Sequence, residues 1–175
     1  MKETTIKKAW DNAGRLDEHL LLGFQNLSLE LPTLHPDTAQ IFRLWQVYLD
    51  NVNPLLKVTH VPTIQARLVA AVGNLFTIDP VFEALMFSIY CTAVLSLDDE
   101  ECRSILGSPR EELSVRYQSG CQQALLKCGF MRTDDRDCLT AFFLYLVSET
   151  RGLKKGILPA DTFRSPSDVA QSPSP

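Results

Sequence analysis

The sequence predicts an all-α protein, an irregular multi-helix domain of about six helices. Apolar residues recur every three or four positions through most of the chain, which is the spacing of one face of an α-helix. Prolines stand at the start of these segments or between them, where a missing backbone N–H costs least. No segment shows the apolar–polar alternation of a half-buried strand or the signal of a hairpin turn.

The size and composition are those of one globular domain. The 175 residues are 45% hydrophobic and 22% charged, which is enough for one core and too short for two comfortable domains. The formal net charge is −4, whereas proteins that hold nucleic acid present a basic surface to the phosphates. The charge therefore argues against DNA or RNA binding by this chain alone.

Residues 37–52 and about 62–75 predict the first two helices. Apolar stripes run along both of them: Ile41, Leu44, Trp45, Tyr48 and Leu49 in the first, and Ile64, Leu68, Ala71, Val72 and Leu75 in the second. We expect the first helix to end before Pro54, because the residue that precedes a proline is pushed out of helical geometry.

Three further helices follow from residue 80 to about residue 127. Residues 80–97 are apolar nearly all round, which predicts a central, buried helix. The acidic residues 98–100 suit the positive start of a short helix that ends at Gly107. Ser108 to Glu111 has the form of a capping box with Pro109 in the first turn, and Gly129 is expected to stop the helix that begins there.

A last helix is expected after Thr133-Asp134-Asp135, which has the composition of a helix cap. Its apolar residues are Leu139, Phe142, Phe143, Leu146 and Val147. The expected organisation is a linker over residues 1–35, the helical domain over 36–150, and a disordered Ser/Pro-rich tail over 151–175.

Targeting signals and cysteine usage indicate the compartment. No secretory signal is visible, and the longest apolar stretch, residues 84–97, is shorter than the roughly 20 residues that span a bilayer. The five cysteines are odd in number and irregularly spaced. We therefore expect reduced thiols in the cytosol or nucleus and no membrane partner.

No catalytic, metal-binding, cofactor-binding or DNA-binding residue is predicted. Cys121 and Cys128 lie two helical turns apart and are interpreted as small core residues, and residues 98–101 as a solvated helix start. The histidines are interpreted as capping or packing residues rather than bases: they are His19, His35 and His60. Gly73 and Gly120 are interpreted as points of close packing.

A small-molecule pocket would need convergent polar groups. Tyr48, Asn53 and His60 are the candidates, and they are close in sequence without a compelling spacing. The residues by themselves thus indicate a helical interaction domain.

Three stretches of the chain resemble a known family. They are LHPDTAQIFRLWQVYLDNVNPLLKVTHVPTIQ (Leu34–Gln65), FEALMFSIYCTAVLSL (Phe82–Leu97) and SVRYQSGCQQALLKCGFMRTDDRDCLTAFFLYLVS (Ser114–Ser148). The order LW-x-x-YL-x-NVNPL-x-K-x-x-H-x-PT is specific. Over about two thirds of its length the chain resembles the regulatory middle region of fungal zinc binuclear-cluster transcription factors.

The resemblance implies a nuclear transcription regulator that acts through contacts with other regulators or with a copy of itself. In the family, DNA is bound through an N-terminal six-cysteine zinc cluster, and residues 1–90 contain no cysteine. The family's helical domain also continues beyond the segment that matches residues 144–148. We therefore expect a truncated regulatory domain without its own DNA-binding module.

Two alternatives remain open. One is a stand-alone helical protein that binds a small molecule or acts as an enzyme, and the other is a non-functional truncated gene product. A truncated domain is also expected to leave part of the apolar 80–97 helix and of the last helix facing water, which favours dimerisation through the exposed face.

Overall fold

The computed structural model describes residues 30–157, with side chains up to residue 149. Their elements in chain order are α2 (Leu31–Leu34), α3 (Thr38–Val47), the π-helical turn η1 (Tyr48–Val52), α4 (Asn53–Leu56), α5 (Val61–Val72), the 3₁₀ turn η2 (Leu75–Thr77), α6 (Pro80–Ser96), α7 (Asp99–Leu106), α8 (Arg110–Lys127) and α9 (Arg136–Ile157). All six expected segments are helical, and the described residues contain no strand. The all-α prediction is confirmed.

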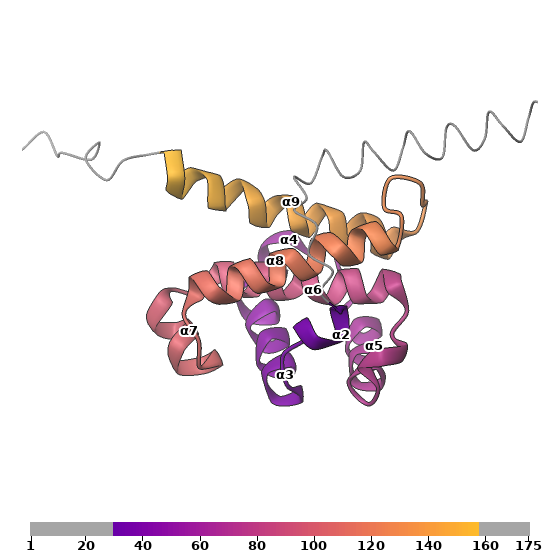
Figure 1. The fold of residues 1–175 in the computed structure, drawn as a ribbon, viewed down its shortest axis with the longest axis horizontal. Helices are drawn as coiled ribbons and strands as arrows, with labels where there is room; N and C mark the ends of the chain where they lie inside the picture. Colours follow the sequence, from indigo (N-terminus) through magenta and orange to yellow (C-terminus); the bar gives the residue numbers. More distant parts are fainter. Residues whose placement is uncertain (1–29, 158–175) are drawn as a thin grey trace, which may run out of the picture.

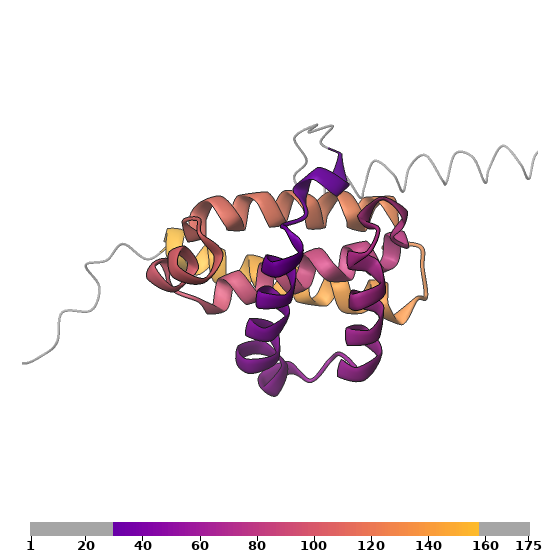
Figure 2. The ribbon, with the colours of Figure 1, turned by 90° about the horizontal axis from the view of Figure 1, so that it is seen from below.

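Helix α6 is the centre of the fold. Every residue from Phe82 to Val94 is buried, and the helix packs against α8, α9, α3 and η1. Figures 1 and 2 show α8 and α9 along one side of α6, while α3 and α5 lie across its other side. The expectation that part of this helix would face water is wrong, because neighbours from this one chain surround it.

The first long helix does not stop before Pro54. Asn53 keeps helical dihedral angles, and its N–H bonds to the carbonyl of Tyr48, one residue further back than in an α-helix. This wider turn resets the hydrogen-bond register, so that Pro54 falls in the first turn of α4, where its missing N–H is not needed. Lys57, in the left-handed conformation with φ of 49°, then ends the helix.

The caps around α7 differ in one place from the prediction. Asp98 and Glu101 form a capping box at the start of α7, and Gly107 ends it with φ of 78°. The predicted box at Ser108 is wrong: Pro109 is the N-cap of α8 and provides no side-chain cap. The Arg110 N–H instead donates to Asp99 Oδ1 at 3.0 Å, so an acid of the preceding helix caps α8.

The described N-terminal residues belong to the domain rather than to a linker. Leu31, Leu34 and His35 are buried, and the Arg116 guanidinium donates to the carbonyls of Thr33, Leu34 and His35 at 3.1–3.2 Å. The expected boundary at residue 35 therefore lies inside the core. The rest of the expected linker, including His19, falls outside the described residues.

The expected boundary at residue 150 falls inside α9, which continues to Ile157. Residues 158–175, most of the expected Ser/Pro-rich tail, lie outside the described residues. Among the helices that the structure describes, none combines the length and the apolar character needed to cross a membrane.

Only one of the two isolated glycines is a close-packing point. A Cβ on Gly120 would lie 2.5 Å from Cε1 of the fully buried Phe87 ring, so α8 can approach α6 only where α8 has no side chain. A Cβ on Gly73 would meet only a carbonyl oxygen at 3.4 Å. The prediction is thus confirmed for Gly120 and wrong for Gly73.

Replacing Gly120 by alanine should destabilise the fold. The helix propensity of alanine is better by roughly 0.5–1 kcal/mol, but the buried Phe87 ring cannot move away, and overpacking of this kind costs about 1–3 kcal/mol. The matched control is Gly73→Ala, which should be neutral or stabilising by up to about 1 kcal/mol. Urea denaturation measures both, and equal stabilities for the two variants would contradict this packing.

Candidate functional site

Two of the three candidate pocket residues, Tyr48 and Asn53, are connected through Thr59, which was not among the candidates. Tyr48 Oη lies 3.1 Å from Thr59 Oγ1, and Thr59 Oγ1 donates to Asn53 Oδ1 at 3.3 Å. Burial raises the pKa of the Tyr48 hydroxyl, against a smaller lowering by Thr59. These groups satisfy one another and hold the segment after α4 against η1. They form an internal brace rather than a ligand site.

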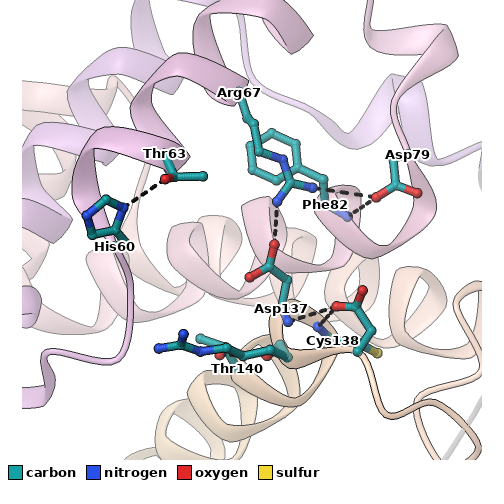
Figure 3. Close-up of polar contacts among 10 residues, drawn as sticks. His60, Thr63, Arg67, Asp79, Phe82, Asp137, Cys138 and Thr140 are labelled. Atoms are coloured by element: carbon teal, nitrogen blue, oxygen red, sulfur yellow. Dashed lines mark hydrogen bonds and ion pairs between the residues drawn. The ribbon is translucent and has the colours of Figure 1, made fainter.

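His60 lies apart from this brace, at the N-cap position of α5. Its Nδ1 is 2.8 Å from Thr63 Oγ1 in the next turn, as Figure 3 shows. A capping or packing role is expected for this histidine; it occupies the N-cap position, but its side chain makes no cap hydrogen bond. His60 also borders a cleft of about 270 Å³. The start of α9 forms the opposite wall of this cleft, with Arg136, Asp137 and Thr140.

Beside this cleft, Arg67 of α5 joins α6 and α9 (Figure 3). Its guanidinium pairs with Asp137 of α9 and lies 3.6 Å from Asp79, and it covers the Phe82 ring at 4.2 Å from the centroid. Asp79 in turn accepts the Phe82 N–H at 3.1 Å and so caps α6. Because both acids already compensate the charge of Arg67, this set of contacts works as a junction of α5, α6 and α9.

A buried acid sits on the otherwise apolar α6. Lys127 Nζ donates to Glu83 Oε2 at 2.9 Å, and His35 Nε2 lies 3.8 Å from Glu83 Oε1. Burial opposes ionisation of Glu83, but the contacts with His35 and Lys127 outweigh it and leave the pKa of this carboxyl below its usual value. Nothing in the sequence points to this cluster, because a glutamate in a first turn is ordinarily a partner of the helix dipole.

His35 completes the cluster as a packing residue, as expected. Its ring lies 4.4 Å from the Phe87 ring, measured between centroids, and its Nδ1 is 3.4 Å from the hydroxyl of Tyr90. Through these contacts the short helix α2 is tied to α6. The sequence alone could not have revealed this cluster, because His35 and Lys127 are distant from Glu83 in the chain and only the fold brings them together.

The cysteines are all free thiols. Cys121 is fully buried, as expected, whereas Cys128 is only partly buried and touches Cys138, with 3.0 Å between the sulfur atoms. No group of three or more His, Cys, Asp or Glu side chains in the described part of the chain could hold a metal ion. The acidic residues 98–101 start α7, as expected.

Helix α9 presents apolar side chains to solvent. Its inner side is buried, whereas Leu139, Phe143 and Leu146 keep 51%, 44% and 43% of their surface exposed. These three residues, spaced by four and three positions, form one stripe that we call the α9 outer face. Figure 1 shows α9 at one edge of the described part of the fold. The expectation that the last helix cannot bury all its apolar residues is confirmed.

The Glu83 cluster should make stability depend on pH. Because the folded state lowers the pKa of Glu83 below that of an ordinary glutamate, the stability that Glu83 contributes is fully present above the unfolded pKa and is lost as the pH falls through the folded pKa. Glu83→Gln should therefore cost about 1–3 kcal/mol at pH 7, and the difference from the parent should shrink below about pH 4. Urea denaturation from pH 7 to pH 3 measures this.

The control for this experiment is Glu112→Gln, at an exposed position of α8. It should change the free energy of unfolding by less than about 0.5 kcal/mol. If the difference in free energy of unfolding between Glu83→Gln and the parent stays constant over the whole pH range, the ion-pair account is contradicted.

Comparison with known proteins gives sequence relatives only; no family model and no solved structure matches. The chain is 53% identical over 150 residues to the transcriptional regulator AacuB of Aspergillus aculeatus, and 51% identical over 150 residues to the transcriptional regulator nsrM of Aspergillus novofumigatus. These matches cover 85% and 82% of this chain but 20% and 21% of the relatives.

A more distant relative is the C6 finger domain transcription factor adaR of Aspergillus niger, 30% identical over 131 residues, which are 73% of this chain and 17% of that protein. The resemblance to fungal transcription factors is confirmed at the level of these relatives. Over most of its length, this chain is thus similar to one segment, about a fifth, of fungal transcriptional regulators.

Proposed function

We propose that this chain is a protein-binding, regulatory segment of a fungal transcription regulator and works in the nucleus. The identity of 53% with AacuB and 51% with nsrM carries the proposal. Both relatives are named as transcriptional regulators, and neither name describes an enzyme. The engagement of Tyr48 and Asn53 with Thr59 also leaves the small-molecule alternative without two of its three candidate residues.

In this proposal, the segment acts through contacts with other proteins rather than by binding DNA directly. Its net charge is −4, so phosphates would be repelled overall, whereas DNA binding draws much of its free energy from neutralising phosphates. In this proposal, DNA is contacted only through a zinc cluster of the kind that residues 1–90 do not contain.

The α9 outer face is the proposed contact surface. Three half-exposed apolar side chains on one helix are costly in water, at about 25 cal/mol for each Å² of apolar area. Stable protein interfaces bury roughly 1,200–2,000 Å², which is more than this stripe can supply. The surface extends further, because Val147 and the exposed Leu55 of α4 line a common hollow of about 80 Å³.

A second copy of the chain is the proposed partner. An apolar stripe on a single outer helix can face its own copy across a two-fold axis, so that one patch serves both sides of the interface. Another regulator with an apolar helix is the competing partner.

Replacing the centre of the α9 outer face should separate the copies. At tens of micromolar, the parent chain should sediment as a dimer, whereas Phe143→Ser/Leu146→Ser should sediment as a monomer, because about 1–2 kcal/mol of apolar burial is lost for each side chain. Val69→Ser/Val115→Ser is the matched control, since both valines are exposed on other helices. A monomeric parent chain would exclude self-association.

The same variants test the regulatory role. Fused to an unrelated DNA-binding domain in a fungal host, the parent chain should change transcription of a reporter, the α9 double variant should lose most of that effect, and the valine control should keep it. If the parent is monomeric but the reporter still depends on Phe143 and Leu146, the partner is another protein. No reporter effect from the parent would contradict the regulatory proposal.

The purified chain should show no sequence-specific DNA binding. In fluorescence polarisation at physiological salt, the affinity for any duplex should be no tighter than the non-specific range of about 10⁻⁴–10⁻⁶ M. Scrambling the duplex sequence should leave the affinity unchanged. Nanomolar, sequence-selective binding would overturn the assignment to protein contacts.

A further inference from the structure

We propose that Cys128 and Cys138 form a dithiol modification site, which a hydroperoxide oxidises to an intramolecular disulfide between α8 and α9. The inference rests on the geometry of the two helix ends and not on the proposed function. The two sulfur atoms are already 3.0 Å apart, whereas a disulfide requires about 2.05 Å.

The turn between the helices creates this proximity. Cys128 is the C-cap residue of α8, and Gly129 reverses the chain with φ of 64°. The Phe130 N–H then bonds to the Leu125 carbonyl at 3.2 Å, which fastens the turn to the end of α8. The returning chain starts α9, where the Asp135 carboxylate accepts the Cys138 N–H at 3.1 Å. The backbone N–H groups of both cysteines are thus fixed by hydrogen bonds, and the two sulfur atoms need to approach by only about 1 Å to reach bonding distance.

The two thiols differ in access. Cys138 is fully buried, whereas Cys128 is only partly buried, so an oxidant from solvent meets Cys128 first. Burial raises the pKa of both thiols. Cys138 also lies in the first turn of α9, where the helix dipole favours a thiolate. Reaction at Cys128 is therefore slow, and the second step at Cys138 is the favoured one.

The chemistry balances with one equivalent of hydroperoxide. The Cys128 sulfur attacks the peroxide, the O–O bond breaks, and an alcohol, or water from hydrogen peroxide, leaves with the thiol proton. The Cys138 sulfur then attacks the sulfenic sulfur, the S–O bond breaks, and water leaves with the second proton. Two thiols are oxidised and one peroxide is reduced.

The other cysteines provide an internal comparison. Cys91, Cys102 and Cys121 are all buried, and burial raises the pKa of both Cys102 and Cys121. Solvent oxidants reach them only when the core opens. Selective loss of Cys128 and Cys138 thiols from the folded chain would therefore separate the proposed site from general oxidation.

Peptide mapping tests the proposal directly. Trypsin cuts after Lys127, Arg132 and Arg136, so that Cys128 and Cys138 fall on different peptides. After treatment of the full-length chain with hydrogen peroxide, trapping of free thiols and digestion, the two peptides should appear as one disulfide-linked pair that a reductant separates. A 1:1 mixture of ¹⁴N- and ¹⁵N-labelled chains should give linked peptides of matching label only.

Variants complete the test. Cys128→Ser and Cys138→Ser should each abolish the linked pair, whereas Cys102→Ser should keep it. The oxidised parent should also unfold at a higher temperature than the reduced parent, because the cross-link restricts the unfolded chain. Mixed labels in the linked pair, or oxidation of Cys128 beyond sulfenic acid with Cys138 still free, would overturn the proposal, and both outcomes can be read in the parent chain alone.

Discussion

The rest of the structure depends on burying α6 on all of its sides. A helix with no polar face has no stable place at a surface, so the other helices must be arranged around it. The fold meets this constraint with α8 and α9 on one side and α3 and η1 on the other. The close contact between α8 and α6 at Gly120 and the burial of the end of α2 follow from the same constraint.

Polar groups on α6 are tolerated because each has a partner. Ser88 donates to the Leu85 carbonyl at 2.8 Å, and Thr92 donates to the Ser88 carbonyl at 3.0 Å, so both hydroxyls are satisfied within the helix. Glu83 instead depends on Lys127 and His35. A buried charge of this kind is expensive without its partner, which links the N-terminal residues and the end of α8 to the centre of the fold.

Helix α9 marks where this arrangement ends. Its inner side completes the cover of α6, while its outer face has no neighbour among the described residues. The relatives are about five times longer than the matched segment, so this chain corresponds in sequence to about a fifth of each of them. In this chain, an apolar outer face next to a fully closed core favours a role in association, with the Cys128–Cys138 contact at the start of the same helix.

The sequence by itself determined the helical class, the six main helices and the central position of α6, because these follow from local spacing, proline positions and the absence of a polar face. It also identified the cap acids of α7 and the packing glycine at residue 120. It could not determine the continuation through Pro54, because a one-residue change of register in η1 has no local signal. The tertiary structure alone decided that Thr59 lies between Tyr48 and Asn53, that Lys127 and His35 meet Glu83, and that Cys128 touches Cys138. The Glu83 contacts join segments that are far apart in the chain and are brought together only by helix packing. The Thr59 and cysteine contacts span shorter stretches, but they depend on the exact geometry of the turns between helices, which has no clear local signal in the sequence.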